Sequence, residues 1–517
     1  MLRWLALVGA LCAGCAPWLS GGAPRPEADV TVIAAAAGVV LAALAAATGP
    51  RWVRVVAAVA AVALAGVVGR LLGLDLTTGL TGDDLPVLAV GSAAVAVAAT
   101  GLARQAAGAR QVRPAGALAL VVVIAAAAAV APTAADAAVT RSETRDARDF
   151  APEPVAERPG HRQWAWQPDT DVVDVVPAGH GVAVATRDGS VVALNGLDGR
   201  QEWRYARPGA VVGSLAASVD RRTVLVSFGS LRDTRAQAAV LLDADTGSPR
   251  FELVVRSVLV QTDQLLPVGR VLAVRDDDVI TGYDLADGRH RWRWTPPPGC
   301  TSRFGQVARG RTTVLVPLEC PDTLSVTALD EATGEQRWRH ETPRGPARDE
   351  QQEVRLRATP DGAIVHVQTI GARTPTDGLL DTATGRVLSR PDRPWTVRTD
   401  PGPTPLLEEQ EGNRATTTHA LHPTTGATTP LSAEACPGRT ADLTTTAHYL
   451  RACADNGREL TVVTQPLDGS PPTSTPVRLD GSGSRSADVL LIAAPGAIVL
   501  ARTASGGTPA PVVGLTG

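Results

Sequence analysis

The chain of 517 residues contains no lysine, so all 49 of its basic residues are arginines. Alanine, glycine and valine dominate the composition, so the codon bias of a GC-rich bacterial genome explains this absence before any function does. The formal net charge is only −3, which gives no electrostatic signature of nucleic-acid binding. We therefore expect no nucleic-acid partner.

Catalytic signatures are missing as well. The sequence has no Gly-x-Ser-x-Gly elbow, no phosphate-binding loop and no zinc-protease helix signature. The histidines are scattered, and the one close pair, His419 and His422, lies on a repeated turn phrase where solvent-facing side chains are expected. Asp276-Asp277-Asp278 lacks the alternating spacing of a calcium loop and is expected to form a charged hairpin turn. We name no catalytic residue and no metal ligand, and a non-enzymatic protein is favoured.

Cysteine is scarce, with six residues in all. Cys12 and Cys15 lie in the first apolar run, and the other four form two close pairs, Cys300 with Cys320 and Cys436 with Cys453. Short intervals and an even count in an exported domain predict two disulfides. Each would stabilise the fold by ~3 kcal/mol by restricting the unfolded chain. Four buried thiols are the alternative; metal ligation is disfavoured because no Cys-x-x-Cys occurs outside the first apolar run.

A short phrase recurs through the last two-thirds of the chain: an apolar residue, Asp, a few variable residues, Gly, and then a large apolar residue. The clear copies contain Asp198 and Gly199 before Trp203, Asp243 and Gly247 before Phe251, Asp284 and Gly288 before Trp292, Asp330 and Gly334 before Trp338, and Asp381 and Gly385 before Val387. Weaker copies end at Gly426 and Gly469, and the seven glycines have a mean spacing of 45 residues. Such a fixed period indicates a repeat architecture.

Each copy lies between short runs of β-prone residues. In the first, residues 181–186 and 191–194 are predicted strands joined by a tight turn at Asp188-Gly189, and residues 201–205 form a further strand. Three clear strands and a weaker one per repeat match a four-stranded propeller blade. The apolar spacing lacks the 3.6-residue period of a helical solenoid. A β-sandwich with similar turns is the alternative.

Blade number follows from length. Residues 160–517 are 358 residues, close to eight repeats, so we predict an all-β propeller of eight four-stranded blades, with seven as the alternative. The tail after Gly469 lacks the end of the phrase, and we expect Gln163-Trp164-Ala165-Trp166 to supply it. Strands from both chain ends would then close the ring and remove exposed sheet edges.

The phrases resemble the repeat of the pyrroloquinoline-quinone-type (quinoprotein-like) propellers, in which a Leu-Tyr-Ala-Leu-Asp strand is followed by Thr-Gly and Trp. Residues 186–203 fit this pattern best, and the resemblance covers about residues 160–517. It implies the fold but no cofactor, because many members bind no quinone and act as scaffolds. A quinone dehydrogenase would need a calcium site of Glu, Asn and Asp, and many have adjacent cysteines. The chain has no Cys-Cys pair, and Asn195, Asn413 and Asn456 lie in turns, so nothing supports bound PQQ or calcium.

Residues 1–139 are different in composition. Only 14 charged residues occur before position 141, and the apolar runs predict about five membrane-spanning helices at 4–19, 30–47, 55–74, 85–103 and 115–135. A soluble bundle would carry charges along one face of each helix, and these runs do not. Small residues such as alanine and glycine let helices approach closely in lipid. The expected domains are thus a transmembrane region (1–139), a linker (140–163) and a propeller (164–517).

Loop charges predict the orientation in the membrane. Arginines lie before the first run, between the second and third, and between the fourth and fifth: Arg3, Arg51, Arg54, Arg104, Arg110 and Arg113. Positive loops stay cytoplasmic, which places the propeller outside the cell membrane after five crossings. The Arg/Asp/Glu-rich segment 140–163 is expected to be a solvated spacer. The first run has an alternative interpretation, as a cleaved signal peptide or a lipoprotein signal ending at Cys15, which leaves the propeller outside in either case.

Three functions are compatible with this organisation. The favoured one is a membrane-anchored, non-catalytic binding or scaffold module for an extracytoplasmic protein, peptide or cell-envelope ligand, because structural repeats are present and a catalytic set is not. The second is a quinone-dependent dehydrogenase that passes electrons into the membrane. The third is an envelope sensor that acts through a membrane partner, since the predicted cytoplasmic loops are too short for a signalling domain.

Overall fold

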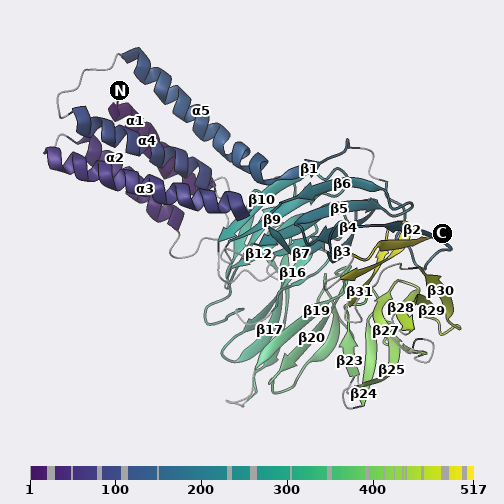
Figure 1. Cartoon of the computed structure of the whole chain (residues 1–517). Helices are drawn as coiled ribbons and strands as arrows, with labels where there is room; N and C mark the ends of the chain where they lie inside the picture. Colours follow the sequence, from purple (N-terminus) through teal and green to yellow (C-terminus); the bar gives the residue numbers. More distant parts are fainter. Residues whose placement is uncertain are drawn as a thin grey trace.

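The fold is that of a computed structural model of the chain. It describes residues 2–19, 30–47, 50–78, 84–105, 114–147, 151–229, 236–256, 265–276, 278–302, 306–345, 352–390, 395–411, 414–423, 425–432, 436, 439–455, 459–478, 488–503 and 509–517. Asn413, Asn456, Asp277, Arg110 and Arg113 lie outside these residues. Figure 1 shows a helical bundle beside a β-propeller, with the last helix leading into the first strand.

The bundle consists of five α-helices in the described part of the chain. They are α1 (Leu2–Cys15, continued by the 3₁₀ turn η1, Ala16–Leu19), α2 (Val30–Ala46), α3 (Arg51–Thr78), α4 (Asp84–Gln105) and α5 (Pro114–Val139). Four of the described helices are long and apolar enough to cross a membrane, and the apolar stretch of α2, Val32–Ala46, is shorter. The helices α3, α4 and α5 extend beyond the apolar runs at both ends, because Ala, Arg and Gln also favour helix.

Small residues bring α1 and α4 into close contact. A Cβ added to Gly91 would lie 2.6 Å from the backbone nitrogen of Ala13, and one added to Gly9 would lie 2.9 Å from the carbonyl oxygen of Gly91. Leu5 and Val95, from the same two helices, are fully buried. This close approach is typical of helices that associate in lipid, where small side chains permit van der Waals contact between backbones.

The remaining chain forms a propeller whose blades are antiparallel four-stranded sheets. Six separate sheets have four strands each, and a nine-stranded sheet contains two further blades plus an added strand, so the described residues form eight blades. Eight, rather than the alternative of seven, is therefore confirmed. In each blade the strands follow one another outward from the central axis, and first strands of neighbouring blades contact each other, as β3 (Val172–Ala178) contacts β7 (Val211–Ala217).

The remaining first strands are β11 (Leu265–Val268), β15 (Ala308–Arg309), β19 (Glu353–Ala358), β23 (Trp395–Arg398), β27 (Arg439–Thr444) and β31 (Asp488–Ala494). The second strands are β4 (Gly181–Thr186), β8 (Thr223–Gly229), β12 (Val271–Asp276), β16 (Thr313–Glu319), β20 (Ile364–Ile370), β24 (Leu406–Glu411), β28 (His448–Asp455) and β32 (Ala497–Thr503). The third are β5 (Ser190–Asn195), β9 (Ala236–Asp243), β13 (Val279–Asp284), β17 (Thr323–Asp330), β21 (Asp377–Asp381), β25 (Arg414–Leu421), β29 (Glu459–Pro466) and β33 (Val512–Thr516). The fourth, outermost strands are β6 (Gln201–Ala206), β10 (Pro249–Arg256), β14 (His290–Trp294), β18 (Gln336–Pro343), β22 (Val387–Ser389), β26 (Thr428–Leu431), β30 (Thr473–Val477) and β2 (Arg162–Trp166).

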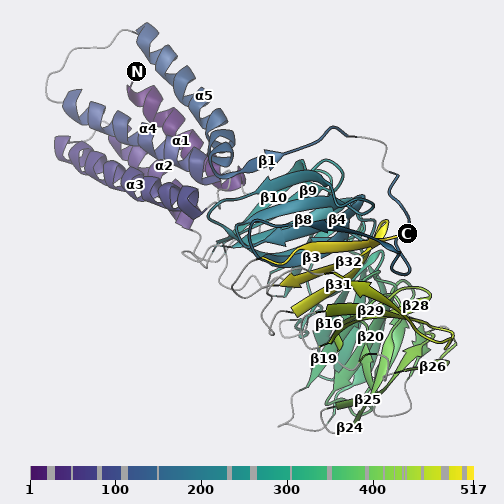
Figure 2. The same ribbon diagram turned by 45° about the vertical axis from the view of Figure 1, so that its right-hand side comes forward.

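Both ends of the propeller sequence build the eighth blade. Strand β2 pairs antiparallel with β33, with Trp164 opposite Gly514, so the N-terminal strand completes a blade made of C-terminal strands. Figure 2 shows β31 and β32 beside β3, where the ring closes. The expectation that residues 163–166 supply the missing fourth strand is confirmed. Closure of this kind leaves no blade without both neighbours.

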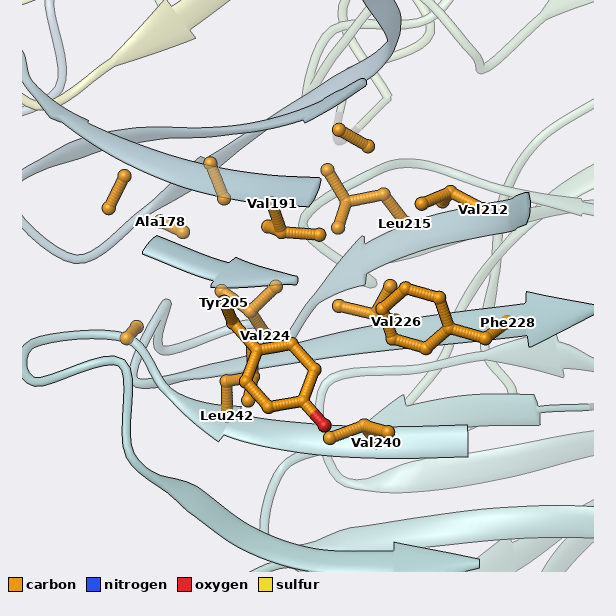
Figure 3. Packing of buried hydrophobic residues seen from close by; sticks show 14 of the residues in the cluster. Ala178, Val191, Tyr205, Val212, Leu215, Val224, Val226, Phe228, Val240 and Leu242 are labelled. Carbon is orange, nitrogen blue, oxygen red and sulfur yellow. The ribbon is translucent and has the colours of Figure 1, made fainter. Parts of the chain in front are cut away.

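Interlocking blades bury the core. Between the first two blades, Tyr205 packs with Leu215, Val226 and Phe228 in one continuous cluster (Figure 3). These side chains are at most 6% exposed. Burial of each such side chain contributes roughly 1.5–3 kcal/mol, so the blade interfaces account for much of the stability of the ring.

The linker does not match the expected solvated spacer. A short strand within it, β1 (Arg141–Glu143), pairs antiparallel with β6 and makes a fifth strand on the first blade. Further along, Val155 bridges to Pro495, and the amide of Ala156 donates to the carbonyl of Ala494 over 3.0 Å. The charged and proline residues of the linker predict solvation. Their backbone groups instead pair with an open edge of a sheet, which satisfies the hydrogen bonds of the linker and of that edge.

Candidate binding surfaces

The repeat phrase forms the turn between the third and fourth strands. Asp330 accepts hydrogen bonds from the backbone amides of Ala332 and Thr333, at 2.8 and 3.0 Å. Its other oxygen accepts from Arg337, seven residues on and across the turn, at 2.7 Å. Asp243 with Arg250 and Asp284 with Arg291 repeat this arrangement. The carboxylate therefore ties the turn to the outermost strand.

The first copy places a different residue at this point. Asn195, not Asp198, occupies the position of Asp243, and its side-chain amide donates to Glu202 over 2.8 Å. Asp198 instead accepts from the amide of Arg200 at the end of the turn. The pairing of positions seven residues apart is kept, with amide and carboxylate in place of carboxylate and guanidinium.

Hydrogen bonds lower the pKa of these aspartates. Burial alone would raise the pKa of Asp330, but the bonds from Arg337, Ala332 and Thr333 outweigh it, and the pKa is lowered from 3.8. The pKa of Asp243 and that of Asp284 are lowered in the same way, against the effect of burial. The ionised form is favoured because each of these donors bonds to the charged carboxylate.

The large residue after each phrase joins neighbouring blades. The indole NH of Trp338 donates to the carbonyl of Thr382 in the next blade over 3.0 Å, and a Cβ on Gly385 would lie 2.6 Å from the same indole. The pairs Trp203 with Gly247, Trp292 with Gly334 and Phe251 with Gly288 pack alike. Trp164 packs on Gly199, so this contact, the tryptophan–glycine latch, also spans the closure of the ring.

Later blades lack the latch. Gly426 has only a serine oxygen 3.8 Å from its would-be Cβ, and Gly469 meets a threonine methyl at 3.4 Å. Between the sixth and seventh blades an ion pair lies instead: both terminal nitrogens of Arg398 donate to Asp442, at 2.8 and 2.9 Å. Burial lowers the pKa of Arg398, but the bonds to Asp442 and Asp400 outweigh it and raise the pKa, so this guanidinium remains charged.

The two predicted disulfides are present. Cys300 is bonded to Cys320 with the Cα atoms 4.1 Å apart, and Cys436 to Cys453 with the Cα atoms 5.4 Å apart. Each disulfide joins the segment before a blade's first strand to the residues at which that blade's second strand ends. Both therefore lie at the same end of the propeller, which we call the loop face. The other end, where first strands turn into second strands, is the turn face.

The turn face is crossed at the axis by two segments. Arg309, at the end of β15, donates to the carbonyl of Ala217 in the second blade and to that of Pro360 in the fifth, both over 2.8 Å. Burial lowers the pKa of Arg309, yet an arginine stays protonated in proteins. On the opposite side of the turn face, the carboxylate of Glu157, in the linker, accepts hydrogen bonds from the hydroxyl of Thr446, at 2.7 Å, and from the backbone amide of Ala447.

A second ionic cluster joins the helices to the propeller. Arg207, at the end of β6, is fully buried, and its guanidinium bonds to Glu252 of the second blade and, over 3.2 Å, to Asp136 in the last turns of α5. Burial lowers the pKa of Arg207, but Glu252 and the other oxygens outweigh it and raise the pKa. Arg145 follows β1 and bonds to Glu202 and Asp245.

The histidine pair and the acidic run that were rejected as metal ligands in the sequence make separate contacts. Among the described residues no group of three or more His, Cys, Asp or Glu side chains could hold a metal ion. The ring of His419 packs edge-on against Trp395 with 4.9 Å between centroids, whereas His422 lies near Thr429. Asp278 accepts hydrogen bonds from Thr301 and Ser302. These contacts give the three residues structural roles.

The repeat position of the tryptophans predicts that they pack between blades, and they do. Their glycine partners, Arg309, Arg398 and the Asp136–Arg207 contact were not predicted from sequence. The sequence signal of the latch is the recurrence of Trp four residues after Gly in some copies.

Comparisons with known proteins found one family model and several solved structures similar to this chain. The family model described as "PQQ_2: Outer membrane protein assembly factor BamB" matches residues 213–428. Similar solved structures include BamB from Moraxella catarrhalis, at 17% identity over 68% of this chain and 98% of that chain, with a TM-score of 0.41. The computationally designed Ika8 protein matches at 14% identity over 67% and 96%, and the WD40 domain of Sif2 at 11% over 68% and 99%, both with a TM-score of 0.41.

No curated protein matches the chain significantly. The matched segment runs from the first strand of the second blade to the last strand of the sixth. Over these residues the chain is similar to the PQQ_2 family, and the same repeated turns and four-stranded sheets continue through the rest of the ring.

Proposed function

We propose that the protein is a membrane-anchored binding module that presents its propeller on the outer side of the cell membrane to a protein partner. The observation that carries the proposal is a complete ring of repeats whose characteristic side chains are used in turns and blade contacts, joined to an apolar bundle. The matched family description names an assembly factor, which supports a role in binding other proteins.

The exposed side chains of the helices support the anchoring. Of the large apolar side chains that are strongly exposed in the described residues, all but Leu197 belong to the bundle. Trp4 and Trp52, 63% and 68% exposed, begin α1 and α3, and Trp18 follows α1 at 81% exposed. Tryptophans at both ends of spanning helices typically lie at the two membrane–water interfaces. Figure 1 shows the N-terminus and the start of α5 away from the propeller.

Photo-crosslinking in intact cells tests the binding function. A benzophenone amino acid replaces Asp322, which is exposed beside Cys320 on the loop face, or Ala383, which is exposed on an outer turn. We expect a discrete protein adduct at position 322 and none at 383. No adduct there or at Pro321, or stoichiometric quinone in the purified protein, would contradict the proposal.

Non-reducing peptide mapping tests the compartment. Protein from cells should contain linked peptides for Cys300–Cys320 and Cys436–Cys453, because the outside of the membrane is oxidising. Free thiols at all four positions would place the propeller in the reducing cytosol and overturn the orientation.

A further inference from the structure

Charges on the first strands are unevenly distributed around the axis. In the described residues of β15 and β19 there are three arginines, Arg309, Arg355 and Arg357, and one acidic residue, Glu353. First strands line the central channel of a propeller. The wall formed by the fourth and fifth blades is therefore locally positive, although the whole chain is slightly acidic.

Arg357 differs from Arg398 of the next blade in its partners. Arg398 is only 20% exposed and bonds to carboxylates of Asp400, Glu408 and Asp442. The side chain of Arg357 is exposed, and within the described part of the chain no carboxylate pairs with it. Arg355, two residues earlier on the same side of the strand, is 50% exposed and pairs with Glu353. Two guanidinium groups thus remain accessible on one strand.

The two ends of the channel are not equivalent. On the turn face, the guanidinium of Arg309 joins carbonyls of the second and fifth blades, and linker residues 154–157 bond to the turns of the seventh and eighth. These contacts place Arg309 and the linker across that end of the ring. A ligand for the arginines therefore enters from the loop face, where the disulfides tie the entering segments of the fourth and seventh blades.

We propose that the channel wall of the fourth and fifth blades binds an acidic peptide segment of a protein partner, inserted from the loop face, with Arg355 and Arg357 pairing with its carboxylates. Planar guanidinium groups match carboxylates in two-bond geometry. The inference rests on the proposed protein-binding function and adds the face and the chemistry of the ligand.

Binding of a labelled probe tests this proposal. Full-length protein in lipid nanodiscs is titrated into fluorescein-labelled hexaglutamate, with hexalysine as the reverse-charge probe, and fluorescence anisotropy is read. We expect hexaglutamate alone to bind, with an affinity that falls as salt rises. Arg357→Gln and Arg355→Gln should each weaken binding at least about tenfold, the loss of one charge-assisted pair. The control is Arg386→Gln, an exposed arginine on the outer turn of the same blade.

Two outcomes of the titration would contradict the channel site. If hexaglutamate does not bind, or if Arg386→Gln weakens it as much as Arg357→Gln does, the channel site is wrong. Unfolding midpoints of the variants should match wild type, because all three side chains are exposed. In the photo-crosslinking experiment, Arg357→Gln should reduce the yield of the adduct at position 322. A wild-type yield would support the protein-binding function but contradict the channel site.

Discussion

Gly385 and Gly426 occupy the same place in consecutive copies of the repeat phrase, and both have a φ of 71°. A residue with a Cβ is strained in that conformation in either copy. Only Gly385 also lies under an indole, that of Trp338, whereas Gly426 faces open space apart from Ser389. The glycine therefore serves the turn in every copy and the blade contact in some.

Alanine at the two positions should separate these roles. Gly426→Ala should lower the free energy of unfolding by about 1 kcal/mol, the cost of a left-handed non-glycine residue. Gly385→Ala should cost a further 1–3 kcal/mol or so, because its methyl group overlaps the Trp338 ring. Urea denaturation of both variants measures the difference. Equal destabilisation would show that the indole moves aside freely.

At the scale of elements, each turn of the phrase is fastened by one carboxylate to its outermost strand. Asp243, Asp284 and Asp330 accept backbone amides of the turn and an arginine seven residues on. The first copy keeps the connection with Asn195 and Glu202. Each of these turns is thus held to the outermost strand of its own blade by a charged side chain, which makes the connection sensitive to pH.

Acid should therefore weaken the propeller. The pKa of Asp330 is lower in the folded protein than the ordinary 3.8, so its stabilising effect is present above that value and is lost as pH falls through the folded pKa. The free energy of unfolding should begin to fall as the pH approaches 3.8 from above and should keep falling below it, through the folded pKa. Asp330→Asn should flatten this dependence, and Asp169→Asn, at an 85% exposed side chain, should not. An unchanged slope for Asp330→Asn would contradict the assignment.

At the scale of the whole molecule, the helices and the propeller are joined by paired backbone and by charge. Strand β1 adds to the first blade, and Arg207 brings together Asp136 of α5 and Glu252 of the second blade. A fully buried guanidinium needs a compensating carboxylate, since a buried charge without compensation is strongly unfavourable. The junction thus holds the bundle and the first two blades in one arrangement.

Glu252 and Asp136, the two acidic partners of Arg207, should differ in what their removal changes. Glu252→Gln should destabilise the propeller by roughly 3 kcal/mol or more, because Arg207 stays buried with less compensation. Asp136→Ala, at a half-exposed side chain, should affect stability less but broaden the distance distribution between spin labels on α5 and β10. Asp146→Ala, exposed in the same segment, is the control. An equally narrow distribution for Asp136→Ala would show that β1 alone fixes the junction.

The sequence by itself determined the elements whose signal is local. Glycine at a fixed spacing marks turns that need positive φ, apolar runs mark helices, and the spacing of Cys300 to Cys320 and Cys436 to Cys453 marks the disulfides. The repeat period also predicted the strand at residues 163–166, because without it the last blade lacks its fourth strand.

Only the tertiary structure decided which residues meet. The contact of Trp338 with Gly385, the pairing of Arg398 with Asp442, the span of Arg309 across the axis and the strand formed by residues 141–143 join positions tens of residues apart or more. The linker composition predicted solvation, because composition does not reveal an available sheet edge. Such contacts depend on the rotation from one blade to the next, and a repeat period does not encode that rotation.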